Sequence, residues 1–235
     1  MAGHRSVIGA LVVVTAGLSA LPAVAAEEMS AMARGGRLYD KHFQENKTAK
    51  PTADHAAYPI KGGQYGKDTS WRCKECHGWD GLGVDGAYSK GGHKTGIKGV
   101  NAYWGKDPAA VAAIIRNPTH GYTEAMLSAQ DVSDLSLFVT KGMPDMRTYV
   151  DVATNKSKGN QAKGEGYFNT MCAGCHGLDG KKVPNAPSLG SVADNGWEMM
   201  HKVLNGQPGE SMPAMRALDP QITADLVAHL QTLPK

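Results

Sequence analysis

The amino-acid sequence predicts an all-α fold of short helices and long Gly-rich loops, divided into two tandem units. One sequence phrase occurs twice, as WRCKECHGWDG at residues 71–81 and as TMCAGCHGLDG at residues 170–180. Between and after these phrases, apolar residues recur at helical spacing behind residues that cap helices. The chain has 29 Gly and 11 Met but only three Phe, so its side chains alone form a thin core and something else is expected to complete it.

The first residues have the pattern of a secretory signal peptide. Met1 to Arg5 carry positive charge, residues 6–24 are almost wholly apolar or small, and small residues follow at the expected cleavage site. We therefore predict a cleaved leader at 1–26. A retained membrane anchor is the alternative, since the stretch approaches the roughly 20 residues that a bilayer needs, although a Gly, a Ser and a Pro interrupt it. No later segment is apolar enough to span, so we expect a periplasmic protein without a membrane span.

The length of 235 residues suits one large or two small domains, and the repeated phrase favours two. We place the first domain at 27–150 and the second at 164–235, joined by a linker at 151–163. The formal net charge of +3 falls to about +2 when Arg5 leaves with the leader. A charge this small gives no reason to expect nucleic-acid binding, and it is compatible with docking to an acidic protein.

Local signals place several helices. Asp107-Pro108 and Asp219-Pro220 each put a capping acid before a proline at the first helical position. Ser128 and Asp131 have the spacing of a capping box. We expect helices at 108–116, 128–140 and 197–204, and a last helix that starts at Pro220 and carries Ile222, Leu226 and Leu230 on one face.

All four cysteines belong to the two copies of Cys-x-x-Cys-His. In an exported protein four cysteines would by default form two disulfides. Cysteines only two residues apart rarely form structural bridges, because the ring is strained, and a bridge between the copies would leave the histidines unexplained. Structural zinc needs four ligands at a spacing that is absent here, and a dithiol redox pair requires no adjacent His.

Covalent haem attachment uses every residue of the motif. Two thiols on one helical turn each add to a vinyl group of the same porphyrin, and the adjacent His ligates the iron. The sequence therefore predicts two covalently bound haem c groups, whose apolar bodies would complete the thin core. The attachment and proximal residues are Cys73, Cys76 and His77 in the first domain and Cys172, Cys175 and His176 in the second.

With these motifs the chain resembles the c-type cytochromes, specifically a tandem two-domain diheme member of the small Met-ligated kind. GEGYFNTMCAGCHGLDG is similar to the first helix and haem motif of that family, and ITADLVAHLQTL is similar to its terminal helix. APSLG at 186–190 is similar to the proximal loop, and MPAM at 212–215 to the distal ligand loop. The resemblance implies two cytochrome c-like domains, each of a few short helices around one haem.

The resemblance also implies ligands for the second haem. His176 would be the proximal ligand, the carbonyl of Pro187 would orient its ring, and Met212 would be the sixth ligand. The rival for the sixth position is Met215, three residues later.

The first domain follows the family less closely. GGRLYD at 35–40 is similar to the start of the family's first helix, yet the haem motif does not follow at once. Residues 42–72 are an insertion, which we expect to be a surface loop wrapping the first haem. By analogy with the second domain, the sixth ligand should lie just before the last helix of the first, where Met126 stands. His120 is the main alternative, and Met143 and Met146 are further candidates.

Two haems with both axial positions filled leave no open iron site for a substrate, so the sequence favours an electron-transfer protein over an enzyme. We expect a periplasmic carrier of single electrons between a donor enzyme or quinol oxidiser and a terminal acceptor, with redox proteins as partners. A diheme oxidoreductase, peroxidase-like or acting on sulfur compounds, is the alternative if the first haem has a labile ligand. A cytochrome subunit of a larger complex would use the same residues.

Overall fold

The computed structural model describes residues 21–235, which fold into helices and loops. No β-strand occurs in this range, and two isolated bridges, Gly83 with Lys98 and Val150 with Ser157, are the β-type pairs it contains. The predicted all-α class is confirmed. None of the helices between residues 21 and 235 combines the length and the apolar character that crossing a bilayer requires.

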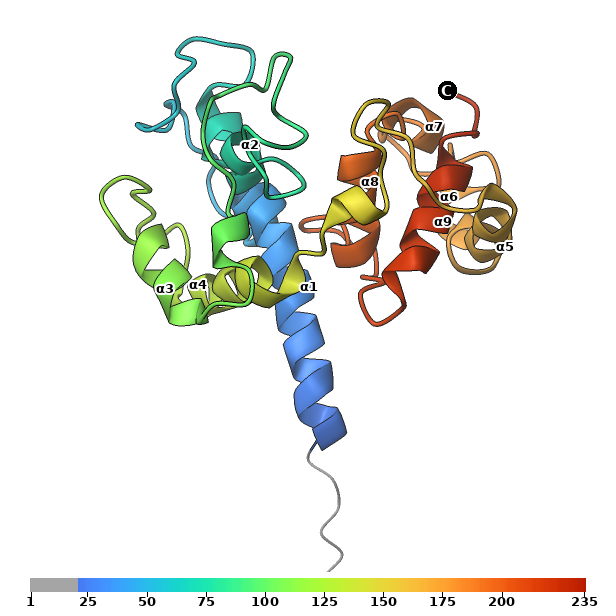
Figure 1. The fold of residues 1–235 in the computed structure, drawn as a ribbon, viewed down its shortest axis with the longest axis horizontal. Coiled ribbons are helices and arrows are strands. Elements are labelled where there is room, and N and C mark those ends of the chain that lie inside the picture. The colour runs from blue at the N-terminus through green and yellow to red at the C-terminus, as the bar shows by residue number, and fades with distance from the viewer. Residues whose placement is uncertain (1–20) are drawn as a thin grey trace, which may run out of the picture.

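The first half of the chain is dominated by one long helix. Helix α1 (Leu21–Glu45) runs between the other helices in Figure 1, and residues at its start, such as Glu27, are exposed. The predicted leader at 1–26 lies outside the described residues except for 21–26, which are the first residues of α1. The remaining elements are η1 (Lys67–Trp71), α2 (Cys73–His77), η2 (Asn101–Tyr103), α3 (Pro108–Ile115), α4 (Ala129–Leu137), the π-helical turn η3 (Phe138–Gly142) and η4 (Met146–Thr148).

The second half contains five helices. Figure 1 shows them gathered on one side of α1, with α3 and α4 on the other side. They are α5 (Gln161–Met171), α6 (Ala173–His176), α7 (Leu189–Val192), α8 (Gly196–Asn205) and α9 (Pro220–Leu230). Helix α5 packs against α9, and α8 contacts both α9 and α1.

The local helix signals are confirmed. The Asp107 side chain accepts a hydrogen bond from Ala109 N at 2.9 Å and caps α3, and Asp219 caps α9 in the same way. Ser128 and Asp131 form a complete capping box at α4, in which each side chain accepts from the other residue's backbone N–H. Two elements depart from expectation: α1 begins well before the predicted start near Gly35, and the helix expected at 128–140 ends at Leu137, where the π-helical turn η3 follows.

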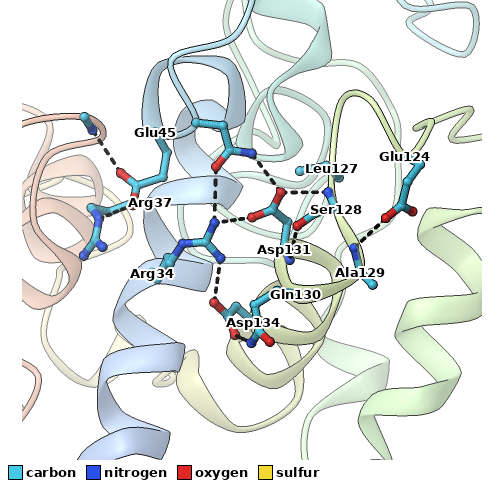
Figure 2. Close-up of polar contacts among 12 residues, drawn as sticks. Arg34, Arg37, Glu45, Glu124, Leu127, Ser128, Ala129, Gln130, Asp131 and Asp134 are labelled. Atoms are coloured by element: carbon cyan, nitrogen blue, oxygen red, sulfur yellow. Dashed lines mark hydrogen bonds and ion pairs between the residues drawn. The ribbon is translucent and has the colours of Figure 1, made fainter.

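Helix α1 is fastened to α4 by an ion-pair cluster (Figure 2). The Arg34 guanidinium lies between two carboxylates of α4, bonding Asp134 Oδ2 through Nη1 at 2.7 Å and Asp131 through Nη2. Asn46 Nδ2 donates to Asp131 Oδ2 at 2.9 Å, so Asp131 serves the helix cap, the arginine and the amide together. These contacts hold α4 against α1.

Two apolar clusters form the core. The first-half cluster joins α1 to α3, α4 and η3 through side chains that include Leu38, Tyr39, Leu135 and Phe138. The junction cluster is shared: Trp79, Tyr88, Met146 and Val150 of the first half pack with side chains of α5, α8 and α9, among them Phe168, Trp197, Met200 and Leu226. The segment predicted as a linker at 151–163 follows Val150, which is fully buried, and Asn155 Oδ1 accepts from Trp197 Nε1 at 2.9 Å.

Candidate functional site

Both Cys-x-x-Cys-His segments form single helical turns. In the first half the turn is α2, and in the second Cys172 caps α6. Each turn stops at a glycine with positive φ, Gly78 at 80° and Gly177 at 75°, a conformation that L side chains rarely adopt. The chain therefore turns away directly after each His. All four cysteines are free thiols, so neither a local disulfide nor a bridge between the copies is present.

The first motif borders an apolar cavity of about 580 Å³, within the roughly 300–1,000 Å³ typical of small-molecule and cofactor sites. Its walls come from the insertion, α2, the loop before η2, α3, the segment after α3, and α4 with η3. Cys73, Cys76, His77 and His120 all line it, together with apolar side chains such as Ile97, Val111, Ile115, Leu127, Leu135 and Val139. Both thiols of the motif and three imidazoles, those of His55, His77 and His120, thus line the same cavity.

His77 and His120 both line this cavity, and their rings lie near each other with similar orientation. Their ring centroids are 6.2 Å apart and their planes differ by 25°. Nδ1 of His77 lies 2.8 Å from the carbonyl oxygen of Lys98, and Nδ1 of His120 lies 3.2 Å from Asn117 Oδ1. Because each oxygen accepts the Nδ1 proton, each Nε2 keeps a lone pair. The His120 ring also forms a hydrogen bond with the backbone of Ile114.

This spacing fits two imidazoles on one metal ion. Histidine nitrogens bind first-row metals at about 2 Å, and each ring adds about 1 Å from nitrogen to centroid, which gives about 6 Å between the two centroids. The observed 6.2 Å agrees. Burial lowers the pKa of His77 and of His120, which favours the neutral imidazole that ligates metals. The residues present therefore fit a covalently held haem with two histidine ligands.

The thiols of the first motif have the wrong electrostatics for dithiol redox chemistry. Burial raises the pKa of Cys73 to about 11 and the pKa of Cys76 to about 12. A reactive dithiol pair needs a lowered thiol pKa, so that a thiolate is available near neutral pH. Cys73 and Cys76 are protonated at neutral pH, which disfavours the thioredoxin-like alternative.

The candidate methionines of the first half lie elsewhere. Met126 packs at the margin of the first-half cluster and is not among the side chains that line the cavity. Met143 belongs to the first-half cluster and Met146 to the junction cluster. The structure therefore brings His120, and none of these three methionines, to the wall that faces His77. The assignment of Met126 stays a prediction without support from the cavity lining.

The second motif is more open than the first. Cys172 and His176 are half-buried, whereas Cys175 is exposed. Met212 and Met215 are both half-buried and both pack beside the junction cluster. Burial lowers the pKa of His176, but among residues 21–235 no hydrogen bond joins its ring to the Pro187 carbonyl. The ligand predictions for this motif stay predictions, with Met212 and Met215 both within the same loop.

Three residues of the first site carry no sequence signal. Lys98 contributes only its carbonyl, which any residue supplies, and Asn117 sits in an ordinary helix-ending Asn-Pro pair. A lone histidine such as His55 is ordinarily a surface or packing group, but it is 6% exposed and its Nε2 lies 2.7 Å from the carbonyl oxygen of His120. Only the folded arrangement, which joins positions 65 residues apart, reveals this contact.

Residues 159–230 match the family model described as cytochrome C oxidase, cbb3-type, subunit III. This region is similar to a c-type cytochrome domain. The match contains the second motif and Met212 and leaves the first motif outside. A comparison with curated proteins found no match. A cytochrome c domain implies covalently bound haem c and suggests a role in electron transfer, which agrees with the broad functional prediction.

Proposed function

We propose that this protein is an exported diheme c-type cytochrome that carries single electrons between redox proteins. A haem at the first motif, in addition to the one at the second motif, is supported by the cavity there. The two thiols of the first motif line this cavity together with the imidazoles of His77 and His120. The second motif lies in the cytochrome c domain, where Cys172 and Cys175 would attach haem and His176 and Met212 would ligate its iron. The periplasmic location rests on the leader pattern at 1–26.

For the first haem we propose His77 and His120 as the two axial ligands. Spacing along the sequence favours Met126, but the facing geometry, the fixed tautomers and the lining of the cavity favour His120. A haem with two His ligands has a lower reduction potential than one with His and Met. The two haems would therefore differ in potential, with the lower potential in the first half.

When bound, haem supplies one-electron exchange between ferric and ferrous iron. The residues around the haem determine whether a substrate can also bind its iron. His77 and His120 would hold the iron of the first haem, and the walls of the cavity around it are largely apolar. Since no open position remains for a substrate, the arrangement favours electron transfer, and the oxidase subunit named by the family model suggests a respiratory oxidase as one class of acceptor.

The haem count is tested by mass spectrometry of the protein matured in a host that attaches haem c. We expect a mass increase of two haem groups, one haem fewer in Cys73→Ser/Cys76→Ser, and one haem fewer in Cys172→Ser/Cys175→Ser. A wild-type protein with a single haem would contradict the diheme proposal. The two double variants serve as controls for each other, because each keeps one motif intact.

The ligands are tested by near-infrared spectroscopy of the oxidised protein. We expect a methionine-to-iron charge-transfer band from one haem only, unchanged in Met126→Leu and lost in Met212→Leu. His120→Ala should open the first iron, so that the reduced variant binds carbon monoxide at one haem while the wild type does not. Rapid carbon monoxide binding by the wild type would instead favour the enzymatic alternative with a labile ligand.

A further inference from the structure

The insertion at 42–72 reaches the cavity through a buried histidine. His55 lies between α1 and η1, and it lines the cavity with Ala57 and Ser70. It is 6% exposed, and none of its hydrogen bonds brings a charged partner to its ring. A buried imidazole in a loop of this kind needs a structural or functional reason, because each of its nitrogens must be satisfied.

The hydrogen bonds of His55 fix both its tautomer and its direction. Ala57 N donates to Nδ1 at 3.1 Å, so Nδ1 is the acceptor and the proton is on Nε2. Nε2 then donates to the carbonyl oxygen of His120 at 2.7 Å. The backbone N of His55 donates to Ser70 Oγ at 2.8 Å, and the ring packs edge-on against Trp71 with a centroid separation of 4.4 Å. The imidazole of His55 is therefore held by hydrogen bonds that involve backbone groups and by its edge-on packing against Trp71.

The segment that carries His120 is anchored on its far side by Tyr122, which is buried and donates to the Trp71 carbonyl, while the hydrogen bonds within residues 117–121 are local. Its neighbours Pro118, Thr119 and Gly121 are exposed, and Gly121 has a positive φ of 65°. The Asn117 side chain accepts from His120 N at 3.0 Å, which is a bond within the segment itself. Within residues 21–235, His55 Nε2 is the donor to the His120 carbonyl. The hydrogen bond from His55 thus connects the exposed turn at 117–121 to the buried part of the insertion that lines the cavity.

We propose that His55 is a positioning residue that holds His120 opposite His77, so that the insertion at 42–72 determines the sixth ligand of the first haem. This inference rests on the proposed His77 and His120 ligation. Without the bond from Nε2, the turn at 117–121 can move the His120 ring away from the cavity. Partners of ligating residues typically change metal affinity or activity by about 10- to 100-fold when they are removed.

The test measures carbon monoxide binding and the low-spin electron paramagnetic resonance signal of the full-length, haem-loaded protein. We expect His55→Ala to bind carbon monoxide at one haem, which the wild type does not do, and to lose the bis-histidine signal. His55→Gln keeps an amide donor that can reach the His120 carbonyl, so it should restore wild-type behaviour. Tyr58→Ala is the matched control, since Tyr58 is buried in the same insertion and its hydroxyl makes no hydrogen bond within the described residues.

The outcomes distinguish the positioning role of His55 from the ligation by His77 and His120. If His120→Ala changes both signals and His55→Ala leaves them as in wild type, the positioning role is overturned while the ligation stands. If Tyr58→Ala changes them as much as His55→Ala does, His55 only supports the fold of the insertion, and the proposal is again overturned. If His120→Ala changes neither signal, the proposed ligation fails, and the role of His55 fails with it.

Discussion

At the scale of single residues, the two haem motifs have different surroundings. Lys74 and Glu75, the variable residues of the first motif, are buried, whereas their counterparts Ala173 and Gly174 are half-buried and exposed. Lys74 Nζ donates to Glu75 Oε2 at 2.8 Å and lies 4.9 Å from the centre of the Trp79 ring. The first turn is therefore held by charges that the second turn lacks.

Glu75 is also bound from outside the motif. His93 Nδ1 lies 2.7 Å from Glu75 Oε1, and the His93 ring is stacked between Tyr65, at 3.9 Å, and Tyr88, at 4.5 Å. Burial raises the pKa of Glu75, but the hydrogen bond from His93 and the charge of Lys74 outweigh it, and the net shift is downward. The carboxylate is thus stabilised in its charged form on both sides.

Removing one charge of this pair should destabilise the fold more than removing both. Glu75→Ala leaves the ammonium of Lys74 buried without its partner, and we expect a loss of roughly 3–5 kcal/mol in the free energy of unfolding. The double variant Lys74→Met/Glu75→Leu replaces the pair by apolar groups of similar volume and should lose less. Denaturant unfolding of the haem-loaded proteins measures both, and an equal loss in the two variants would contradict this interpretation of the pair.

At the scale of elements, close helix packing depends on a few glycines. At Gly35 and Gly36 of α1 an added Cβ would overlap Asp134 of α4 and Asn205 of α8, respectively. In α5 a Cβ on Gly164 would overlap the carbonyl oxygen of Asp225 in α9. These positions let helices approach each other at backbone distance. A Cβ on Gly166, two residues along α5, would meet no atom within 4 Å and would point into open space.

The two glycines of α5 should therefore respond in opposite directions to alanine. Gly164→Ala forces α5 and α9 apart, and we expect a loss of about 1–3 kcal/mol, as for overpacked cores. Gly166→Ala meets no neighbour and should stabilise the helix by roughly 0.5–1 kcal/mol, because alanine has the better helix propensity. Thermal unfolding of both variants checks this, and a stabilised Gly164→Ala protein would refute the close approach.

Local chemistry explains which elements the sequence could predict. Helices α3, α4 and α9 start where Asp107, Ser128 and Asp219 cap them, since a cap depends on residues within one turn. The predicted start of α1 is wrong, because it relies on similarity at GGRLYD rather than on a cap. Long-range packing, such as that of Gly164 on α9, has no local signal.

The same distinction holds for the candidate site. The spacing of Cys73, Cys76 and His77 along one turn is local and visible in the sequence. The choice between Met126 and His120 depends on how the segment after α3 folds back over the cavity, and the hydrogen bonds of His120 to Asn117 and His55 contribute to that arrangement. Sequence spacing can name both candidates, but it has no means of ranking them by their distance from His77.

At the scale of the whole molecule, the two halves are joined by polar contacts at α1 and α8. Asp40 of α1 is fully enclosed and binds Arg72, beside the first motif, and Lys202 Nζ of α8 at 2.5 Å. Although burial raises the pKa of Asp40, the charges of Lys202 and Arg72 hold it well below its usual range. One helical turn of α1 thus links the surroundings of the first motif to the second half.

His201 of α8 completes this junction as a neutral group. Its Nε2 donates to the carbonyl oxygen of Gly36 at 2.8 Å, its Nδ1 has no hydrogen-bond partner among residues 21–235, and its ring lies 5.1 Å from that of Trp79. Burial lowers the pKa of His201 to about 4, and it lowers the pKa of His42, on α1, to about 4 as well. Both rings are therefore neutral in the folded protein above about pH 4.

The fold should therefore weaken in mild acid, before its carboxylates titrate. Between pH 6.5 and 4 the unfolded chain binds protons at His201 and His42 that the folded chain excludes, so the free energy of unfolding falls as the pH falls through this window. A shift of this size amounts to roughly 3 kcal/mol per buried histidine. Below about pH 4 the loss of the Asp40 charge adds a further decrease, because the pKa of Asp40 is lowered in the folded state.

His201→Gln separates titration from packing at the junction. Glutamine can still donate to the Gly36 carbonyl but does not titrate, so we expect the pH slope of the free energy of unfolding between pH 6.5 and 4 to decrease, with the contributions of His42 and of the other buried histidines remaining. The slope is the relevant readout, since a changed stability at pH 7 would report packing alone. Unfolding curves at a series of pH values measure it, and a slope equal to that of the wild type would mean that His201 is protonated within the folded junction.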